Sequence, residues 1–410
     1  MSESEHLTLA IVGGGAAGFF AAINCALQNR SNRVLLLEKT RQVLAKVRIS
    51  GGGRCNVTHA CFDHSFLVKN YPRGNKELRG PFTRFQPRDT VQWFESRGVL
   101  LKTEDDGRMF PITDQSQTII DCLLSEAKKA GVELLLEHGL QNIRKMESGF
   151  VLDVANGSEI HCDRLLIASG SSPKIYPMLE ELGHGIVPLV PSLFTFNIPD
   201  SPFLDLAGIS LDSVLVQLPQ WKGKQHGPLL FTHWGLSGPA VLKLSAWCAR
   251  ELHDADYRAK IVINWLPGMS KEEIENRLMD ARLKLAAKQI GSESHFSLPK
   301  QVWRRLLMMA GIPEGTRWSA LSSKQQQHLV LHLHGTELDI SGKTTYKQEF
   351  VTCGGVALEE VDFKTMESKR CPGLYFAGEV LNIDGVTGGF NFQNAWTTGW
   401  VAGISMCRHT

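Results

Sequence analysis

The first forty residues alternate between short apolar runs and polar or glycine-rich breaks. Residues 7–12 read LTLAIV, residues 13–18 read GGGAAG, and an apolar stretch at helical spacing leads to a second apolar run at 34–37. This order predicts a buried strand, a tight turn, a helix and a second strand parallel to the first. The acidic residue Glu38 follows the second strand, twenty residues after Gly18.

The glycine turn has the GxGxxG spacing of a dinucleotide-binding turn. Gly13 permits the turn out of the strand, Gly15 lets a pyrophosphate approach the backbone, and Gly18 lets the helix pack closely. The helix N-terminus offers free N–H groups to the phosphates, and Glu38 can accept hydrogen bonds from ribose hydroxyls. The alternative is an ordinary βαβ turn without a ligand. The residues expected to bind the dinucleotide here are Gly13, Gly15, Ala16, Ala17, Gly18, Glu38 and Lys39.

The remaining pattern predicts one nucleotide-binding domain in two pieces, 1–190 and 346–410, with a β-rich insert at 191–268 and a helical insert at 269–345. The first piece contains a long helix near 114–130, a hairpin turning at Asn156-Gly157, and a strand at 164–170. The insert is predicted to have helices at 271–290, 298–310 and 322–329 and a strand at 329–333, and the last helix begins near Asn391. The fold class is therefore α/β and Rossmann-like.

The C-terminal piece indicates which dinucleotide is bound. Gly378 and Glu379 end a strand, and Gly388, Gly389 and Asn391 open the last helix. The acid can bond ribityl or ribose hydroxyls, and the helix dipole can face the pyrimidine end of an isoalloxazine, where reduced flavin carries negative charge. A single GxGxxG motif, combined with this second helix N-terminus from the C-terminal piece, favours FAD over NAD.

Composition narrows the class further. The chain is 43% hydrophobic and 21% charged, with a net charge of +2. Its nine cysteines are scattered without a CxxC pair, which fits reduced thiols and a cytoplasmic location. The early first strand argues against a signal peptide, and no apolar run reaches the roughly 18–20 residues that span a bilayer. His328, His332 and His334 lack a carboxylate or cysteine at ligand spacing, so a polar strand face is expected rather than a metal site.

Four segments together resemble the BaiN/YhiN-like family of NAD(P)/FAD-dependent flavoproteins, some labelled aminoacetone oxidase-like. They are SGGGRCN at 50–56, FTHWGLSGP at 231–239, TCGGV at 352–356 and AGE at 377–379. The resemblance implies a split FAD domain whose insert combines a β-barrel-like part and a helical part. It also implies reduction of activated carbon–carbon double bonds, with NAD(P)H as transient reductant. The family's substrates include a steroid enone and a uracil of ribosomal RNA, and an amine oxidase activity is also described.

The basic glycine loop at 40–60 is expected to lie against the flavin. Its cations can neutralise the pyrophosphate or stabilise reduced flavin, Lys46 and Arg54 more clearly than Arg48. Cys55 can donate a proton as hydride arrives, although a small buried thiol is the alternative. His233 is a candidate acid or orienting group. The candidates are Cys55, His233 and Arg54 for catalysis, and Lys46, Ser50, Gly51, Gly52, Ala168, Gly170, Gly378, Glu379, Gly388, Gly389 and Asn391 for the cofactor.

One local feature suits an RNA substrate. Residues 69–88 interleave six basic residues with Tyr71, Phe82 and Phe85, although a solvated charged surface is the commoner explanation of such a run. The expected function is a reductase acting on an enone or on a ribosomal RNA uracil. Two alternatives stay open: a flavin amine oxidase that releases peroxide, and a non-catalytic RNA-binding protein stabilised by FAD.

Overall fold

The computed structural model describes residues 6–344 and 351–408. The chain forms two compact units, one comprising Met1–Val190 and Lys347–Thr410, the other Pro191–Tyr346. The predicted boundary at 345/346 lies outside the described residues. In the described part no helix is long and apolar enough to cross a membrane.

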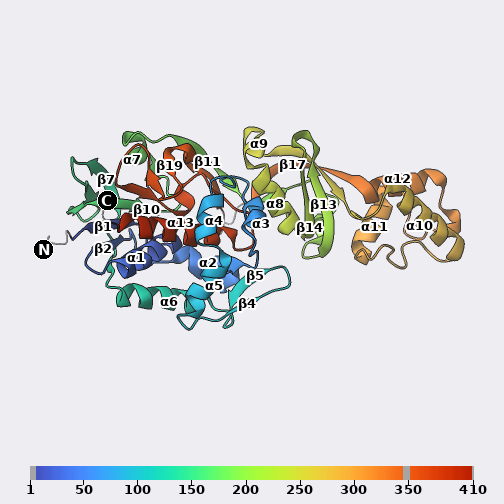
Figure 1. Cartoon of the computed structure of the whole chain (residues 1–410). Coiled ribbons are helices and arrows are strands. Elements are labelled where there is room, and N and C mark those ends of the chain that lie inside the picture. The colour runs from blue at the N-terminus through green and yellow to red at the C-terminus, as the bar shows by residue number, and fades with distance from the viewer. Residues whose placement is uncertain (1–5, 345–350, 409–410) are drawn as a thin grey trace. The chain divides into compact units, whose positions relative to one another are not determined.

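A seven-stranded sheet forms the centre of the first unit (Figure 1). Five strands are parallel, in the order β6 (Glu133–Leu135), β2 (Arg33–Leu37), β1 (Thr8–Val12), β10 (Arg164–Ile167) and β21 (Leu374–Phe376). The edge strands β20 (Glu367–Ser368) and β19 (Val361–Asp362) are antiparallel. Chain order reverses between β1 and β10, so the carboxyl ends of these two strands open onto the position where α/β sheets bind ligands. The predicted α/β Rossmann-like class is confirmed.

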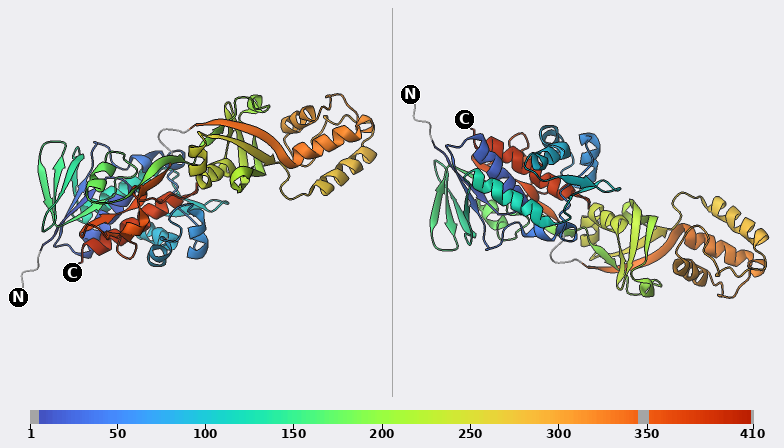
Figure 2. Two further views of the ribbon diagram at one scale, coloured as in Figure 1. Left: turned by 90° about the horizontal axis from the view of Figure 1, so that it is seen from above. Right: turned by 90° about the horizontal axis from the view of Figure 1, so that it is seen from below.

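Helices α1 (Ala16–Gln28) and α13 (Phe390–Met406) pack side by side over this sheet, blue and red in Figures 1 and 2. Two glycines of α13 make the close approach possible. A Cβ on Gly399 would lie 2.6 Å from the carbonyl oxygen of Ala17, and one on Gly403 would lie 2.5 Å from that of Ala21. Because both residue numbers increase together, the two helices run parallel, and their N-termini point toward the same end of the sheet.

Smaller elements complete the first unit. The strands β7 (Leu140–Lys145), β8 (Phe150–Val154) and β9 (Glu159–Cys162) form an antiparallel sheet, and the expected turn at Asn156-Gly157 joins the last two. The other elements are α2 (Ala45–Gly53), β3 (Thr58–His59), α3 (His64–Leu67), α4 (Arg79–Arg84), α5 (Pro87–Glu95), β4 (Leu101–Thr103), β5 (Arg108–Pro111), α6 (Ser116–Lys129), α7 (Tyr176–Glu181), β11 (Ile186–Ser192) and β18 (Val351–Val356).

The second unit contains a closed six-stranded barrel. Its strands, in barrel order, are β12 (Thr195–Asn197), β15 (Gly235–Ser237), β14 (Gly223–Thr232), β13 (Ser210–Leu218), β16 (Arg258–Asn264) and β17 (Thr336–Thr344). The helices of this unit are α8 (Pro239–Trp247), α9 (Ala249–Asp254), α10 (Lys271–Lys284), α11 (Lys300–Met309) and α12 (Ser323–Gly335). The last three leave the barrel after β16 and return through β17, so the predicted helical stretch 269–345 includes a barrel strand. Barrel and helices share one apolar core that includes Trp265, Trp303 and Trp318.

The strand expected at 329–333 is wrong. These residues belong to α12, which begins with a capping box formed by Ser322 and Gln325. Leu329, Val330 and Leu333 are buried on one helical face. Histidines alternate with leucines in this segment and imitate the period of a strand, but burial at spacings of three and four stabilises the helix.

Candidate active site

The glycine turn between β1 and α1 lies at the carboxyl end of the sheet. Gly13 has a φ of +117°, and a Cβ there would lie 2.5 Å from the carbonyl oxygen of Ala168, which follows β10. A Cβ on Gly18 would lie 1.9 Å from the Gly13 carbonyl oxygen, whereas one on Gly15 would meet nothing within 4 Å. The turn is therefore closed on the sheet side and open in front of α1, whose first residues are Ala16 and Ala17.

Glu38 stands beside this turn. Its Oε2 accepts a hydrogen bond from the Gly14 N–H at 3.0 Å, and its Oε1 accepts from the Thr40 N–H at 2.9 Å. These donors fix the carboxylate next to the open side of the turn, where a ribose-binding acid is needed. Lys39 is exposed.

A second group of polar side chains gathers where β10 and β21 end and β18 begins. Lys46 forms an ion pair with Glu379, whose other oxygen accepts a hydrogen bond from the Thr352 N–H at 3.0 Å. A Cβ on Gly170 would lie 3.6 Å from the Glu379 carboxylate, and the Gly378 N–H donates to Thr398 Oγ1 on α13. The candidates Lys46 and Glu379, which follow strands on opposite sides of the point where chain order reverses, are thus brought together.

Tyr176, which sequence reasoning missed, belongs to the same group. Burial, and then the charge of Glu379, raise the pKa of its phenol. Its hydroxyl oxygen is buried and has no hydrogen-bond partner in the described part of the chain. A buried hydroxyl of this kind calls for a polar partner, so it fits the wall of a ligand site. No spacing rule in the sequence points to it.

The loop expected to lie against the flavin starts as a right-handed helix and continues with residues in the left-handed backbone conformation. Residues 45–49 are helical, Ser50 is extended, and Gly51, Gly52 and Gly53 have φ values of +59°, +67° and +84°. A Cβ on Gly52 or Gly53 would meet nothing within 4 Å. Three successive left-handed residues favour glycine strongly and leave the backbone bare on one side, where a ligand can approach.

The two polar residues after this loop differ in environment. Arg54 donates to Glu104 at 2.6 Å, lies 3.5 Å from Asp114, and has its guanidinium 4.0 Å from the Phe110 ring centre. Two carboxylates therefore compensate its charge. Cys55 is fully buried, and this burial raises its pKa to about 12. Its thiol stays protonated at neutral pH, which suits a proton donor and not a thiolate nucleophile.

The N-terminus of α13 is held by a strand that follows Cys55. A Cβ on Gly389 would lie 2.5 Å from the Thr58 carbonyl oxygen, and the His59 ring stacks on Phe390 with centres 4.7 Å apart. Asn391 exchanges two hydrogen bonds of 2.8 Å with Gly385, which closes the glycine loop that contains Gly388. His59 follows the SGGGRCN segment at 50–56 by three residues, and this closeness in sequence could have identified it.

The two helix N-termini are offset along the sheet. Gly399 packs at Ala17, and Phe390 precedes Gly399 by nine residues, so α13 begins about 13 Å beyond the glycine turn along the axis. The positive ends of two parallel helices can therefore face two separated parts of one elongated anionic ligand. This arrangement, with the open backbone at Gly15 and Gly52, fits a flavin dinucleotide.

His233 belongs to the other unit. It lies exposed in the turn between β14 and β15, next to Trp234. The sequence pattern predicts that His328, His332 and His334 lie on a polar strand face. That expectation is wrong, because His332 and His334 lie on helix α12. No group of histidine, cysteine, aspartate or glutamate side chains in residues 6–344 and 351–408 could hold a metal ion.

The aromatic residues proposed for RNA stacking at 69–88 are not available. Tyr71 and Phe82 are fully buried and Phe85 is 4% exposed, so the interpretation of these rings as a stacking surface is wrong. They form core contacts under α13: the Tyr71 hydroxyl donates to the Phe390 carbonyl at 2.7 Å. Arg73 is likewise used internally, in an ion pair with the buried Asp384.

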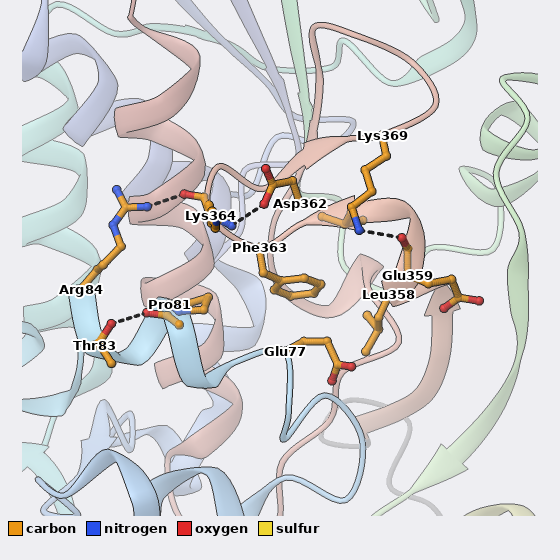
Figure 3. Close-up of a pocket in the computed structure, with 12 residues that line it drawn as sticks. Glu77, Pro81, Thr83, Arg84, Leu358, Glu359, Asp362, Phe363, Lys364 and Lys369 are labelled. Atoms are coloured by element: carbon orange, nitrogen blue, oxygen red, sulfur yellow. Dashed lines mark hydrogen bonds between the residues drawn. The ribbon is translucent and has the colours of Figure 1, made fainter.

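A pocket of about 600 Å³ lies elsewhere in the first unit, between α4 and residues 358–369 (Figure 3). Phe363, Leu358 and Pro81 give it apolar walls. Arg84 donates to the Lys364 carbonyl oxygen, and Lys369 Nζ to the Glu359 carbonyl oxygen at 2.9 Å. None of the residues expected to bind the cofactor lines it, so this pocket is separate from the candidate site.

Comparison with known proteins agrees with the geometry. The family model described as HI0933-like protein Rossmann domain matches residues 7–405. The chain is 32% identical to "Ribosomal RNA dihydrouridine synthase" of Escherichia coli K12, with 97% of both chains covered. It is 28% identical to "3-dehydro-bile acid delta(4,6)-reductase" of Clostridium scindens, with 96% of this chain and 98% of that protein covered.

A solved structure of E. coli quinol fumarate reductase covers 98% of this chain and 70% of its own, with 16% identity and a TM-score of 0.50, which shows a shared fold. The matched family spans both sequence pieces of the sheet as well as the insert between them. The resemblance inferred from the four motifs is confirmed, and the chain is a member of the HI0933-like, BaiN/YhiN-like family of FAD-dependent oxidoreductases.

Proposed function

We propose that this enzyme reduces a carbon–carbon double bond of a uracil in ribosomal RNA to give dihydrouridine, with NAD(P)H as the reductant. The observation that carries the proposal is full-length similarity to two proteins named "Ribosomal RNA dihydrouridine synthase". The E. coli protein is 32% identical and the Haemophilus influenzae protein 30% identical, and the alignments cover at least 97% of each chain. A third full-length relative is also named as a reductase.

The residues of the site fit FAD. The N–H groups at the start of α1 would bind the pyrophosphate, with Glu38 on the ribose, and the bare backbone at Gly51 and Gly52 would lie against the ring system. Lys46 and Glu379 would bind polar groups between these ends. Bound FAD supplies a hydride acceptor and donor, which none of the twenty side chains provides.

The chain itself supplies charge stabilisation and a proton. The N-terminus of α13 presents a positive dipole end that favours anionic charge nearby. Reduction of the double bond consumes one hydride and one proton, and the proton comes from a group that is protonated at neutral pH. Cys55 has the required state, since a thiol is protonated at neutral pH and burial raises its pKa further, to about 12, which also makes it a weaker acid. His233 is the second candidate, from the barrel unit.

The experiment that tests the proposal has two steps. The purified enzyme is mixed anaerobically with NADPH or NADH, and loss of the oxidised flavin band near ~450 nm is followed. An unmodified ribosomal RNA transcript is then added, and its nucleosides are analysed for uridine that has gained two hydrogens. Bleaching by a nicotinamide nucleotide followed by dihydrouridine formation is expected. Peroxide release with an amine, without NAD(P)H oxidation, would instead establish an oxidase.

A further inference from the structure

Two exposed phenylalanines lie on and just before the short helix α3. Phe66, on α3, is 57% exposed, and Phe62, just before α3, is 38% exposed. Each ring has a cation beside it: Lys69 Nζ lies 4.5 Å from the Phe66 ring centre, and the Arg88 guanidinium carbon lies 5.6 Å from that of Phe62. We call these four residues the aromatic platform. Each exposed ring is thus combined with a cation from the same region of the chain, a combination that can bind both a base and a phosphate.

The platform is continuous with the candidate active site. His59, which stacks on Phe390 at the N-terminus of α13, precedes Phe62 by only three residues. Three residues of chain span at most about 11 Å. A ligand bound across the platform would therefore lie beside the end of the site where the flavin ring is proposed to bind.

The charges around the platform suit a polyanion. In the described residues, neither Lys69 nor Arg88 has a carboxylate within 4.0 Å, and the same holds for the exposed cations Lys76 and Arg79. The adjacent carboxylate of Asp63 is instead used locally, accepting from the Ser65 N–H at 2.7 Å as the cap of α3. Four cations thus remain able to meet phosphates.

We propose that the aromatic platform binds single-stranded RNA next to the target uracil, with bases stacking on Phe62 and Phe66 and phosphates meeting Lys69 and Arg88. The inference rests on the proposed function for its substrate class. An enzyme that acts on a base must take it out of its stack, and aromatic side chains hold the neighbouring unstacked bases without reading their sequence. The buried rings of the 69–88 segment cannot do this, whereas these two can.

The test measures binding of a fluorescent single-stranded uridine-rich RNA to FAD-loaded enzyme. We expect Phe66→Leu to weaken binding about tenfold, within the range for one stacked base, and Phe66→Tyr to retain it. Leucine keeps the apolar volume but has no ring, so this pair of variants separates stacking from packing. For the charges, Lys69→Gln is compared with Arg33→Gln, which removes one positive charge at the opposite, amino end of β2. Only the former should weaken binding and lower its dependence on salt.

The outcomes separate the platform from the proposed function. If Phe66→Leu binds the RNA as tightly as the unchanged enzyme, the platform is wrong, whether or not dihydrouridine forms. If binding depends on Phe66 but no RNA is reduced, the platform holds and the proposed reaction fails. If the unchanged enzyme does not bind RNA, the platform is overturned as well. FAD content and NAD(P)H-dependent flavin bleaching should be equal in all variants, which excludes misfolding.

Discussion

Substitution by alanine should have different effects at two glycines of the same turn. At Gly15 it should weaken FAD binding, and at Gly18 it should lower the stability of the fold. In Gly15→Ala the new methyl group meets no protein atom within 4 Å, and the backbone at this N-cap is extended, with φ −94° and ψ −171°. Alanine is a poorer N-cap than glycine but restricts the unfolded chain, so these effects of under about 1 kcal/mol oppose each other. The protein should therefore fold with nearly unchanged stability.

The methyl group of Gly15→Ala does, however, enter the space in front of α1. If the pyrophosphate binds there, it must move or lose hydrogen bonds to backbone N–H groups, each a charge-assisted bond of about 1.5–3 kcal/mol. FAD affinity should fall at least tenfold. Gly18→Ala places its methyl group 1.9 Å from the Gly13 carbonyl oxygen, and overpacking of this kind costs about 1–3 kcal/mol or more. That variant should be destabilised even without FAD.

The assay combines two measurements on deflavinated protein. Thermal unfolding reports stability, and titration with FAD, followed by the change in flavin fluorescence, reports affinity. Weak FAD binding with normal unfolding is expected for Gly15→Ala, and a lowered Tm for Gly18→Ala. Wild-type FAD affinity in Gly15→Ala would refute the placement of the pyrophosphate. A wild-type Tm in Gly18→Ala would refute the close approach of α1 to its own turn.

Three further predictions concern the described chain as a whole. Eight of the nine cysteines are buried, so a thiol reagent should modify one site rapidly in the native protein, and Cys61→Ser should abolish that phase. Burial lowers the pKa of His184 although the hydrogen bond to Glu360 opposes this shift, so the unfolded state binds a proton at His184 first as the pH falls. Stability should be full above pH ~6.5 and fall below it, by at most about 1.4 kcal/mol per pH unit, and urea titrations of His184→Gln should lack this component. Arg73→Met leaves the buried Asp384 without its guanidinium and should cost about 3–5 kcal/mol in denaturant unfolding, whereas the double variant that adds Asp384→Leu should recover part of that loss.

The sequence predicts those parts of the fold whose chemistry is local. The strand, turn and helix at 7–28 and the start of α13 near Asn391 follow from apolar periodicity and glycine position, and both agree with the structure. The strand expected at 329–333 fails because alternation of histidine and leucine satisfies two periods at once. Only packing against the rest of the helical unit decides between them, and that contact involves residues far away in the chain.

The site is less predictable because a motif does not state what its residues pack against. Tyr71 and Phe82 lie in the basic segment 69–88 and are fully buried, whereas Phe66, just before that segment, is 57% exposed. Since helices α3 and α4 are each only one or two turns long, their orientation depends on the elements they pack against and not on their own pattern. The sequence therefore proposed for base stacking three rings that the core uses, and RNA binding itself stays a prediction.

The glycines of the site show the same limit of the sequence, and the structure resolves it by showing what surrounds each one. Gly13 and Gly389 can be compared with Gly15 and Gly52. The GxGxxG spacing already assigns the turn to Gly13 and the pyrophosphate to Gly15, but no spacing rule separates Gly389 from Gly52. In the structure, a Cβ on either of the first two would lie 2.5 Å from a backbone carbonyl oxygen, whereas a Cβ on either of the other two would meet nothing within 4 Å. The first pair is required for the chain to fold. The second pair has no neighbour in the described protein that demands its small size. At Gly52 the φ of +67° still favours glycine, whereas at Gly15, with φ −94°, the reason for glycine is best sought in the ligand. Substitutions to alanine at the first pair should therefore lower stability, and Gly15→Ala should lower FAD affinity alone. Gly52→Ala should lower FAD affinity and also cost roughly 1–2 kcal/mol of stability, because its φ of +67° is left-handed.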